Sequence, residues 1–303
     1  MCGNVPKIEI TDVTARDGFQ MEQQWIPTEK KVEVINRIIH AGVKRVEATS
    51  FVSPKAVPQL RDAKKVLEII KKENTVVTVL VPNKKGAESA LDVPIDEVNV
   101  VVSVSETHNL RNIKRTVQQS IDEIYDISNL LQKKNKRLNV GLATTFGCPF
   151  EGLYSVEKVT EVIEKLRDLE ISCFTLSDTT GMANPKQIKE FIHLLMKKFP
   201  SEQFSLHLHN TRGMGLVNLL SGYEAGIKKF DASLGGIGGC PFAPGATGNV
   251  CLEDTVHMFE QMGVETGISM ENLISTANYL ENLLGYKLSG QVMKSGPSTR
   301  TFT

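Results

Sequence analysis

The stretch Phe204-Ser205-Leu206-His207-Leu208-His209-Asn210 alternates apolar and polar residues, and a pattern with helical spacing follows it at Gly213–Ala225. Residues two apart on a strand point to the same face, so this run predicts a strand with two imidazoles side by side near its end. Two neighbouring imidazoles suit a divalent metal. They also fit two polar residues that close a strand, and the stretch alone leaves both interpretations open.

The same unit of one strand and one helix recurs along the chain. Near-continuous apolar runs suit parallel strands buried on both faces. We expect strands at Ile8–Thr14, Arg45–Phe51, Val76–Pro82, Glu97–Ser105, Leu138–Phe146, Cys173–Asp178, Phe204–Asn210 and Lys229–Gly235. We expect helices between them, among others at Thr28–Ala41, Ile113–Lys134, Ser155–Leu169, Pro185–Phe199 and Gly213–Ala225. Eight such units predict an α/β fold, a closed (β/α)8 TIM barrel.

The chain of 303 residues is predicted to form one catalytic barrel domain over 1–303, because its composition does not change along its length. Such barrels need about 250 residues. Residues 265–303 make an additional C-terminal segment, with a helix over Ser269–Tyr286 and a polar tail from Gln291 that we expect to be frayed or to act as a mobile flap. A doubly wound open sheet is the alternative, but no G-x-G-x-x-G motif follows the first strand.

The composition argues against several classes of function. Lys plus Arg and Asp plus Glu number 35 each, so the net charge of zero gives no electrostatic basis for binding nucleic acid or a membrane surface. No apolar run approaches the ~20 residues of a membrane-spanning helix. The five cysteines are odd in number and scattered, which favours a reducing compartment. Because no transit segment or peroxisomal address is apparent, we expect a cytoplasmic protein.

Reactive side chains recur at the ends of the predicted strands, where a barrel carries its active site. Asp17 offers a carboxylate ligand, and Arg16 beside it offers a permanent cation for an oxyanion. Glu47 is acidic and faces the inside of the barrel, and Asp178 ends the sixth strand. Each has an ordinary explanation, namely a surface ion pair, a salt bridge or a helix cap. Their gathering at one end of successive strands favours a functional interpretation.

Asp17, His207 and His209 together form a mixed oxygen and nitrogen set that suits magnesium, manganese or cobalt better than structural zinc. Asn249 is a further candidate ligand through its amide oxygen, but it also fits the N-cap of a helix that starts next to it. The run GGIGGCPFAPGATGN at 235–249 can approach a ligand closely and move as a lid. Cys240 in this run is a candidate proton donor or acceptor, although the residue alone favours an ordinary loop cysteine.

Five motifs resemble those of 3-hydroxy-3-methylglutaryl-CoA (HMG-CoA) lyases, which belong to the barrel metallolyases that also include isopropylmalate and homocitrate synthases. The motifs are RDGFQME at 16–22, EATSFVSPK at 47–55, GCPFEG at 147–152, HLH at 207–209 and GGCP at 238–241. The resemblance covers nearly the whole chain from about Ile8. The cysteine loop and SFVSPK are specific to the lyase branch, whereas the Arg-Asp pair and H-x-H are shared more widely.

The resemblance implies a usually dimeric barrel, hence a homodimer, that cleaves HMG-CoA to acetyl-CoA and acetoacetate with magnesium or manganese. Arg16 would hold the thioester carbonyl as it becomes an enolate, Cys240 would protonate the carbanion, and Glu47 would orient the groups at the metal. The other implied roles are metal binding by Asp17, His207, His209 and Asn249, catalysis by Asp17 and His207, and substrate binding by Ser50 and Thr179.

Four positions depart from the family pattern: Asn210 replaces the usual Asp after the second histidine, Phe19 and Met21 replace Leu and Asn, and Ser177 replaces Gly. A carboxylate beside a ligand histidine orients the ring and raises its basicity, so Asn210 is expected to weaken metal binding or to mark a changed substrate. The identity of the substrate's acyl group therefore stays open: the substrate is HMG-CoA or a relative such as citramalyl-CoA.

Two further functions remain as alternatives. A synthase of the same superfamily would condense acetyl-CoA with a 2-oxo acid, but such synthases usually carry a further regulatory domain and this chain is short. A non-enzymatic barrel that binds acyl-CoA ranks last, because the ligand set and the cysteine are intact.

The cationic stretch Asn109–Arg115 and Lys55 are candidates for CoA contacts, although a solvated helix start explains most of these residues.

Overall fold

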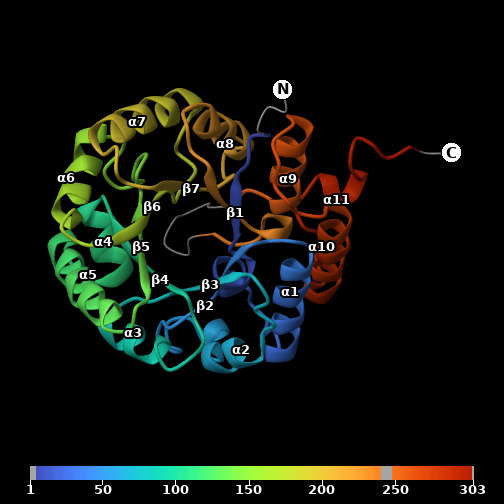
Figure 1. Cartoon of the computed structure of the whole chain (residues 1–303), viewed down its shortest axis with the longest axis horizontal. Helices are drawn as coiled ribbons and strands as arrows, with labels where there is room; N and C mark the ends of the chain where they lie inside the picture. The colour runs from blue at the N-terminus through green and yellow to red at the C-terminus, as the bar shows by residue number, and fades with distance from the viewer. Residues whose placement is uncertain (1–4, 240–247, 302–303) are drawn as a thin grey trace.

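The computed structural model describes residues 5–239 and 248–301. Within these ranges eight parallel strands, β1 to β8, pair in chain order and close into a barrel surrounded by helices (Figure 1), which confirms the predicted fold. The strands are β1 Glu9–Asp12, β2 Arg45–Ser50, β3 Val76–Leu80, β4 Glu97–Ser103, β5 Arg137–Ala143, β6 Ile171–Asp178, β7 Phe204–Leu208 and β8 Lys229–Ala232. Several predicted strands ran too far, because their last residues already belong to the loops that form the site.

The helices lie outside the barrel and connect successive strands. They are α1 Thr28–His40, α2 Ala63–Ile69, α3 Lys84–Ala90, α4 Glu106–Ile113, α5 Val117–Gln132, α6 Val156–Leu166, α7 Pro185–Lys198, α8 Gly215–Glu224, α9 Leu252–Gln261, α10 Met270–Leu284 and α11 Val292–Ser295. The prediction of one helix over Ile113–Lys134 was wrong at its start. A capping box between Thr116 and Gln119 begins α5 there, after Lys114 has ended α4 in the left-handed conformation.

Alternation along the strands separates the helix-facing core from the barrel interior. On β7, Leu206 is fully buried and packs outward under α8, while the next residue, His207, points inward. A Cβ atom on Gly222 of α8 would lie 2.2 Å from Leu206 Cδ1, so only glycine permits this close packing of helix on strand. The interior is unusually polar, since Glu47, Glu97 and other charged side chains occupy it.

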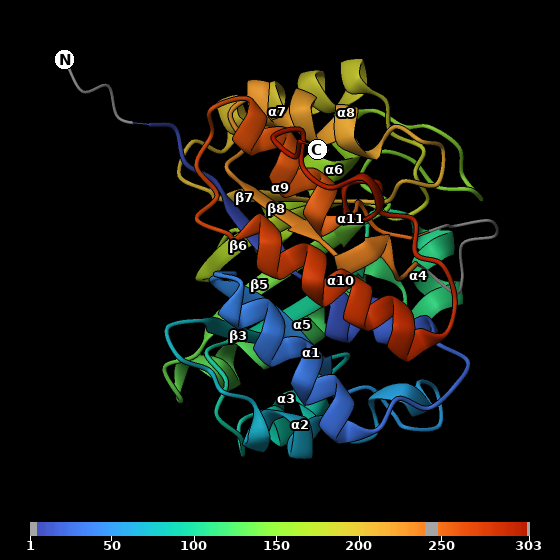
Figure 2. The same cartoon turned by 90° about the vertical axis from the view of Figure 1, so that its right-hand side faces the viewer.

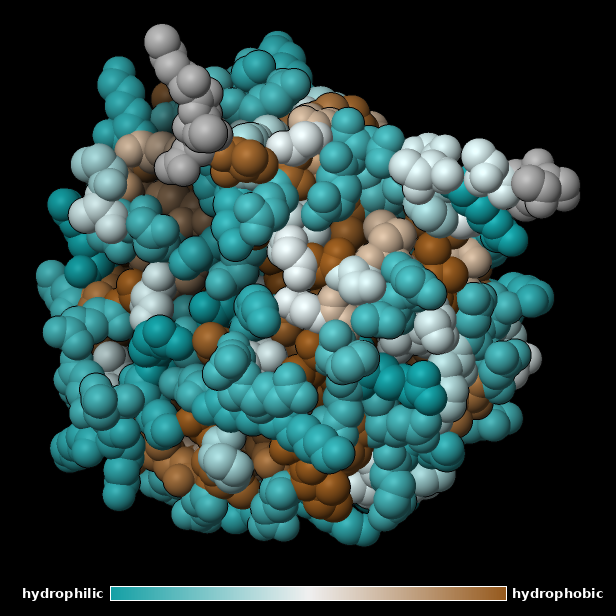
Figure 3. All heavy atoms as spheres, turned by 45° about the vertical axis from the view of Figure 1, so that its right-hand side comes forward, coloured by the Kyte–Doolittle hydropathy of each residue, from teal (hydrophilic) through white to brown (hydrophobic). Residues whose placement is uncertain are grey.

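The additional C-terminal segment is helical, as predicted, and α10 lies along α1 (Figure 2). The expectation of a frayed tail was wrong for its first residues. Val292 and Met293 of α11 are buried, and the Asp254 carboxylate accepts the backbone N–H of Val292 at 2.7 Å. The face seen in Figure 3 is mainly hydrophilic, with small apolar areas between polar side chains. Among the described residues no helix has the length and apolarity that a membrane crossing requires.

Candidate metal centre and active site

Three of the predicted ligands meet at the carboxyl end of the barrel. Asp17, His207 and His209 are buried, and each offers one ligand atom within 4.8 Å of the others. The two histidine Nε2 atoms are 3.2 Å apart, and His209 Nε2 lies 3.9 Å from Asp17 Oδ2. Two ligands at about 2.1 Å from an ion and at a right angle to each other lie about 3 Å apart, so the donor set fits a divalent cation.

A helical turn places Asp17. The carbonyl oxygen of Val13, directly after β1, accepts the backbone N–H groups of Arg16 at 3.2 Å, Asp17 at 2.8 Å and Gly18 at 3.3 Å. Wide turns of this type are common at functional sites. A Cβ atom on Gly18 would lie 2.6 Å from Ile237 Cδ1, so glycine lets the turn approach the loop after β8.

Asn249 is brought beside Asp17 by a short antiparallel bridge between His209 and Asn249. Its Nδ2 donates to Asp17 Oδ2 at 2.7 Å and to the Ile237 carbonyl at 3.0 Å. Both partners accept hydrogen bonds, so they fix the amide nitrogen and leave Oδ1 as the atom available to a cation. The alternative of an N-cap was wrong, because α9 begins at Leu252 after Cys251.

Asp231 on β8 is a site residue that the sequence analysis missed. Its Oδ2 lies 3.2 Å from His207 Nδ1, the ring nitrogen on the side away from His209. Burial opposes the charged imidazolium, but the Asp231 carboxylate outweighs it and raises the pKa of His207. The signal was present in the alternation of Lys229-Phe230-Asp231-Ala232, which turns Asp231 into the barrel with the ligands.

Arg16 is mostly buried and forms ion pairs with both Asp17 and Glu47, so a surface ion pair of Arg16 with Asp17 is excluded, and the partner of Glu47 is Arg16 rather than a lysine. Arg16 Nε donates to Glu47 Oε2, and Arg16 Nη1 donates to Asp17 Oδ1. Burial disfavours the charged guanidinium, yet Glu47 and Asp17 together raise the pKa of Arg16. The other Glu47 oxygen accepts from Asn99 Nδ2 at 2.7 Å, a partner that the sequence analysis also missed.

The charge states of Asp17 and His209 suit a cation. Burial raises the pKa of the Asp17 carboxyl, but Arg16 and the two histidines more than compensate and hold it below its ordinary value. Burial and the neighbouring His207 lower the pKa of His209 to about 4. At neutral pH the site therefore offers a carboxylate oxygen and a neutral imidazole nitrogen, the forms that bind metals.

The remaining predicted residues have more local partners. The buried Asp178 carboxylate accepts the N–H groups of Met182 at 2.8 Å and Ala183 at 3.0 Å, so it holds the loop before α7 rather than capping the helix itself. Thr179 Oγ1 accepts the Thr144 N–H at 2.9 Å. Ser50 Oγ is buried and has no hydrogen-bond partner among the described residues. Cys240 lies outside the described residues.

The position of Asn210 changes its expected significance. Its Oδ1 accepts the backbone N–H of Gly215 at 2.9 Å, at the start of α8, so the side chain faces that helix. Among the candidates for CoA contacts, Asn109 is buried and its Nδ2 donates to the Arg115 carbonyl at 2.9 Å, which is a structural role. Arg111 lies over the Phe150 ring at 4.1 Å from its centroid.

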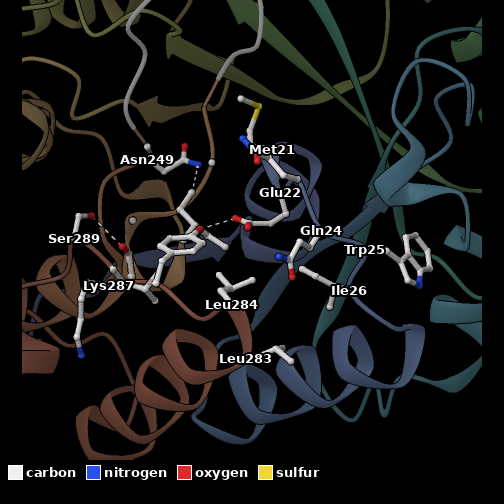
Figure 4. A pocket seen from close by; sticks show the side chains of 18 of the residues that line it. Met21, Glu22, Gln24, Trp25, Ile26, Asn249, Leu283, Leu284, Lys287 and Ser289 are labelled. Atoms are coloured by element: carbon white, nitrogen blue, oxygen red, sulfur yellow. Dashed lines mark hydrogen bonds between the residues drawn. The ribbon is translucent and has the colours of Figure 1, made fainter.

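A cavity of about 660 Å³ lies beside the ligands (Figure 4). Its walls come from the segment between β1 and α1, the glycine loop after β8, and the end of α10. The lining residues include Glu22, Gln24, Asn249, Leu284 and Lys287. Asn249 lines this cavity and donates to Asp17, so the cavity adjoins the candidate metal centre.

The comparisons with known proteins agree with this geometry. The HMGL-like family model matches residues 7–280. A hydroxymethylglutaryl-CoA lyase of Bacillus subtilis is 42% identical over 95% of this chain and 98% of its own, and a (R)-citramalyl-CoA lyase of Chloroflexus aurantiacus is 38% identical over 96% and 95%.

A solved HMG-CoA lyase structure from Acenitobacter baumannii, in complex with coenzyme A and 3-methylmalate, superposes with a TM-score of 0.96 and 44% identity. That match covers 100% of this chain and 99% of the other. The family model matches well over half of the chain, and relatives with more than 30% sequence identity match nearly all of it. This chain therefore belongs to the HMGL-like family.

Proposed function

We propose that this protein is a carbon–carbon lyase that depends on a divalent metal and cleaves HMG-CoA to acetyl-CoA and acetoacetate. The observation that carries the proposal is the buried cluster of Asp17, His207 and His209 with Arg16 joined to Asp17, in a chain similar to HMG-CoA lyases along its length. We propose magnesium or manganese as the cation, because the donor set mixes oxygen and nitrogen and lacks thiolates.

In the proposed reaction the substrate's tertiary hydroxyl loses its proton to a nearby carboxylate or imidazole, for which Asp17 and His207 are the candidates, and the adjacent carbon–carbon bond breaks. The bonding electron pair becomes the enolate of acetyl-CoA, and a proton then completes the new methyl group. A bound divalent cation supplies acidity to that hydroxyl by lowering its pKa. Asp17, His207, His209 and Asn249 are the residues that would hold it.

Arg16 is the residue we assign to the developing enolate oxygen. Glu47 and Asp17 engage its Nε and Nη1, which fixes the plane of the guanidinium and leaves Nη2 to donate to substrate. A fixed cation in a site shielded from water stabilises negative charge without reorganisation. We propose Cys240 as the proton donor to carbon, on the resemblance of its loop to the lyase branch. Ser50 and Thr179 are proposed substrate contacts.

We propose that the acyl-CoA arm enters through the cavity of about 660 Å³ beside Asn249. The support is that Asn249 lines the cavity beside the candidate metal centre, and that the mixed lining of amide, backbone and aliphatic groups suits an amide-containing pantetheine chain. The similar Acenitobacter baumannii protein was solved in complex with coenzyme A. Gln24 and Leu284 then stand as contacts along the arm.

Citramalyl-CoA is the second candidate substrate, because a (R)-citramalyl-CoA lyase is 38% identical over 96% of this chain. The deciding experiment supplies metal-stripped protein with each acyl-CoA, with and without Mg²⁺ or Mn²⁺, and measures acetyl-CoA release. HMG-CoA turnover with acetoacetate formation supports the proposal, and preferential citramalyl-CoA turnover supports the alternative. The Asp17→Asn variant is the matched control. Failure of the wild-type protein on both substrates with every metal would refute the lyase function.

We further propose a homodimer in the cytoplasm. The buried thiols of Cys148, Cys173 and Cys251 are free, which is consistent with a reducing compartment. The dimer rests on the family resemblance. Light scattering on the purified chain tests it, with a mass of one protomer as the contrary result.

A further inference from the structure

The interior of the barrel contains a line of polar contacts that runs from its amino-terminal end to Arg16. Such interiors are usually filled by branched apolar side chains in layers. Here a cavity of about 210 Å³ lies between the first residues of the strands, and its lining includes Glu97, Asn99 and Asn139. Charged side chains at the base of the barrel line this cavity together with the amides of Asn99 and Asn139, which continue from the base toward the catalytic end.

The base of this line is an ion-pair cluster around Glu97. The carboxylate is 2% exposed and receives Arg45 Nη1 as well as Arg137 Nε, the latter at 2.7 Å. Arg45 Nε also contacts Glu9 Oε1 at 3.0 Å. Because two guanidinium groups surround the Glu97 carboxylate, it can only accept hydrogen bonds at this end of the barrel.

Two amide side chains, those of Asn139 and Asn99, continue the hydrogen bonds from Glu97 toward the catalytic end of the barrel. Asn139 Nδ2 donates to Glu97 Oε2 at 2.9 Å and to Asn99 Oδ1 at 3.0 Å. With its oxygen engaged in this way, Asn99 turns its Nδ2 toward Glu47 Oε1, at 2.7 Å. Because the Glu97 carboxylate accepts from Asn139, the amide nitrogen of Asn139 must face it. The hydrogen bond from Asn139 to Asn99 Oδ1 then fixes which end of the Asn99 amide faces Glu47.

Glu47 is the point at which this line reaches the catalytic end. One of its oxygens accepts from Asn99 and the other from Arg16 Nε, whose Nη1 contacts Asp17 Oδ1. Glu47 on β2 and Asn99 on β4 come from alternate strands, which share a layer in a barrel. On β3 between them, Thr78 is paired in register with Glu47.

We propose that Asn99 is a positioning residue: it fixes the Glu47 carboxylate, which in turn holds the Arg16 guanidinium in the orientation that meets the substrate's thioester oxygen. This role rests on the proposed lyase function. Small displacements of a catalytic group cost up to about 100-fold in rate. We therefore expect Asn99→Leu, which keeps the volume and removes both hydrogen bonds, to lower kcat by roughly 10- to 100-fold with little change in KM.

The matched control is Thr78→Val. Thr78 lines the same cavity, but its hydroxyl donates to the Val46 carbonyl at 3.2 Å rather than to Glu47. We expect this variant to keep the kcat of the wild type. If both variants lower kcat in proportion to a loss of folded protein, measured by denaturant unfolding, Asn99 serves only the packing of the barrel and the proposal is overturned.

A double-mutant cycle with Glu47→Gln tests the route of action. If Asn99 acts through Glu47, Asn99→Leu adds little further loss of kcat once Glu47 has been replaced. Additive losses overturn the proposal. The cycle also separates this role from a general effect on stability, because the free energy of unfolding is measured for the same four proteins.

A second readout does not need turnover. The Arg16 Nε–H donates to a buried carboxylate, so nitrogen-15 NMR should resolve its resonance, which Arg16→Lys assigns. We expect Asn99→Leu to shift or broaden this resonance and Thr78→Val to leave it unchanged; an unchanged resonance in Asn99→Leu overturns the proposal. If the wild type fails on every acyl-CoA, the proposed function falls, and the NMR comparison still decides whether Asn99 orients Arg16.

Discussion

At the scale of single residues, Gly238 is a position where the candidate metal centre leaves no room for a side chain. Its φ is +114°, and a Cβ atom there would lie 2.5 Å from Asn249 Nδ2 and 2.9 Å from Asp17 Oδ2. Gly238→Ala must therefore displace at least one ligand. We expect the affinity for Mn²⁺, measured by calorimetry on metal-stripped protein, to fall by roughly 10- to 100-fold, as for other changes that disturb the support of ligands.

A second glycine provides the control for that substitution. Gly263 also has a positive φ, +74°, but its Cβ would meet nothing within 4 Å. Gly263→Ala carries the same kind of backbone strain without the steric conflict. Equal Mn²⁺ affinities for the two variants would contradict the argument from close approach.

The substitution Asn210→Asp tests the family difference beside the histidines. Asn210 accepts the Gly215 N–H, whereas Asp231 contacts His207. We expect Asn210→Asp to leave Mn²⁺ affinity close to that of the wild type, and Asp231→Asn to lower it roughly 10- to 100-fold. A large gain of affinity in Asn210→Asp, measured in the same titrations, would restore the interpretation that this position orients a ligand.

At the scale of elements, Glu253 of α9 holds the short turn after β8 that leads into the glycine loop. Both of its oxygens accept the Gly235 N–H, at 3.1 Å and 3.0 Å. Burial raises the pKa of Glu253 to about 7. The folded state therefore keeps a proton that the unfolded chain releases, and the free energy of unfolding should fall as pH rises from about 4.5 to about 7, by an order of 2–3 kcal/mol.

The substitution Glu253→Gln should flatten this pH dependence, because the amide does not titrate in that window. Urea unfolding at pH 5.0 and pH 7.5 measures the slope, and Glu190→Gln at an exposed position of α7 is the control. Some slope remains, since burial also raises the pKa of Asp12 to about 7. The linkage would be disproved by a slope in Glu253→Gln as steep as that of the wild type.

The strands and helices were largely predictable from the sequence, whereas the contacts between side chains on different strands were not. All eight strands follow from apolar runs, because burial on both faces of a parallel sheet requires them. Asp17 and His207 could be found because they stand at strand ends. Asp231 stands at the same place near the end of β8 as His207 does on β7, but its contact with His207 depends on the register in which these two strands pair, and the contact of Asn99 with Glu47 depends on how β4 lies relative to β2. Asn99 meets Glu47 from 52 positions away.

At the scale of the whole molecule, the candidate metal centre spans the seam where the barrel closes. Strand β8 pairs with β1 in register from Glu9 and Lys229 to Asp12 and Ala232. Asp17 follows β1, while His207 lies on β7. A cation held by both residues therefore links the two ends of the sheet, and it should stabilise the global fold rather than one loop.

Mass action gives the size of this effect. A cation at 100 times its Kd stabilises the folded state by about 2.7 kcal/mol, which for a protein of this size raises Tm by roughly 4 °C. We expect Mg²⁺ or Mn²⁺ to raise the Tm of metal-stripped wild-type protein and EDTA to reverse it, in calorimetric scans. His207→Ala, which lacks a ligand on one side of the seam, should show no such rise; an equal rise would mean that the cation binds elsewhere. Because each ligand strand belongs to the closed barrel, the transition should also stay single as Tm moves, whereas a metal that ordered only the glycine loop would leave the main transition in place.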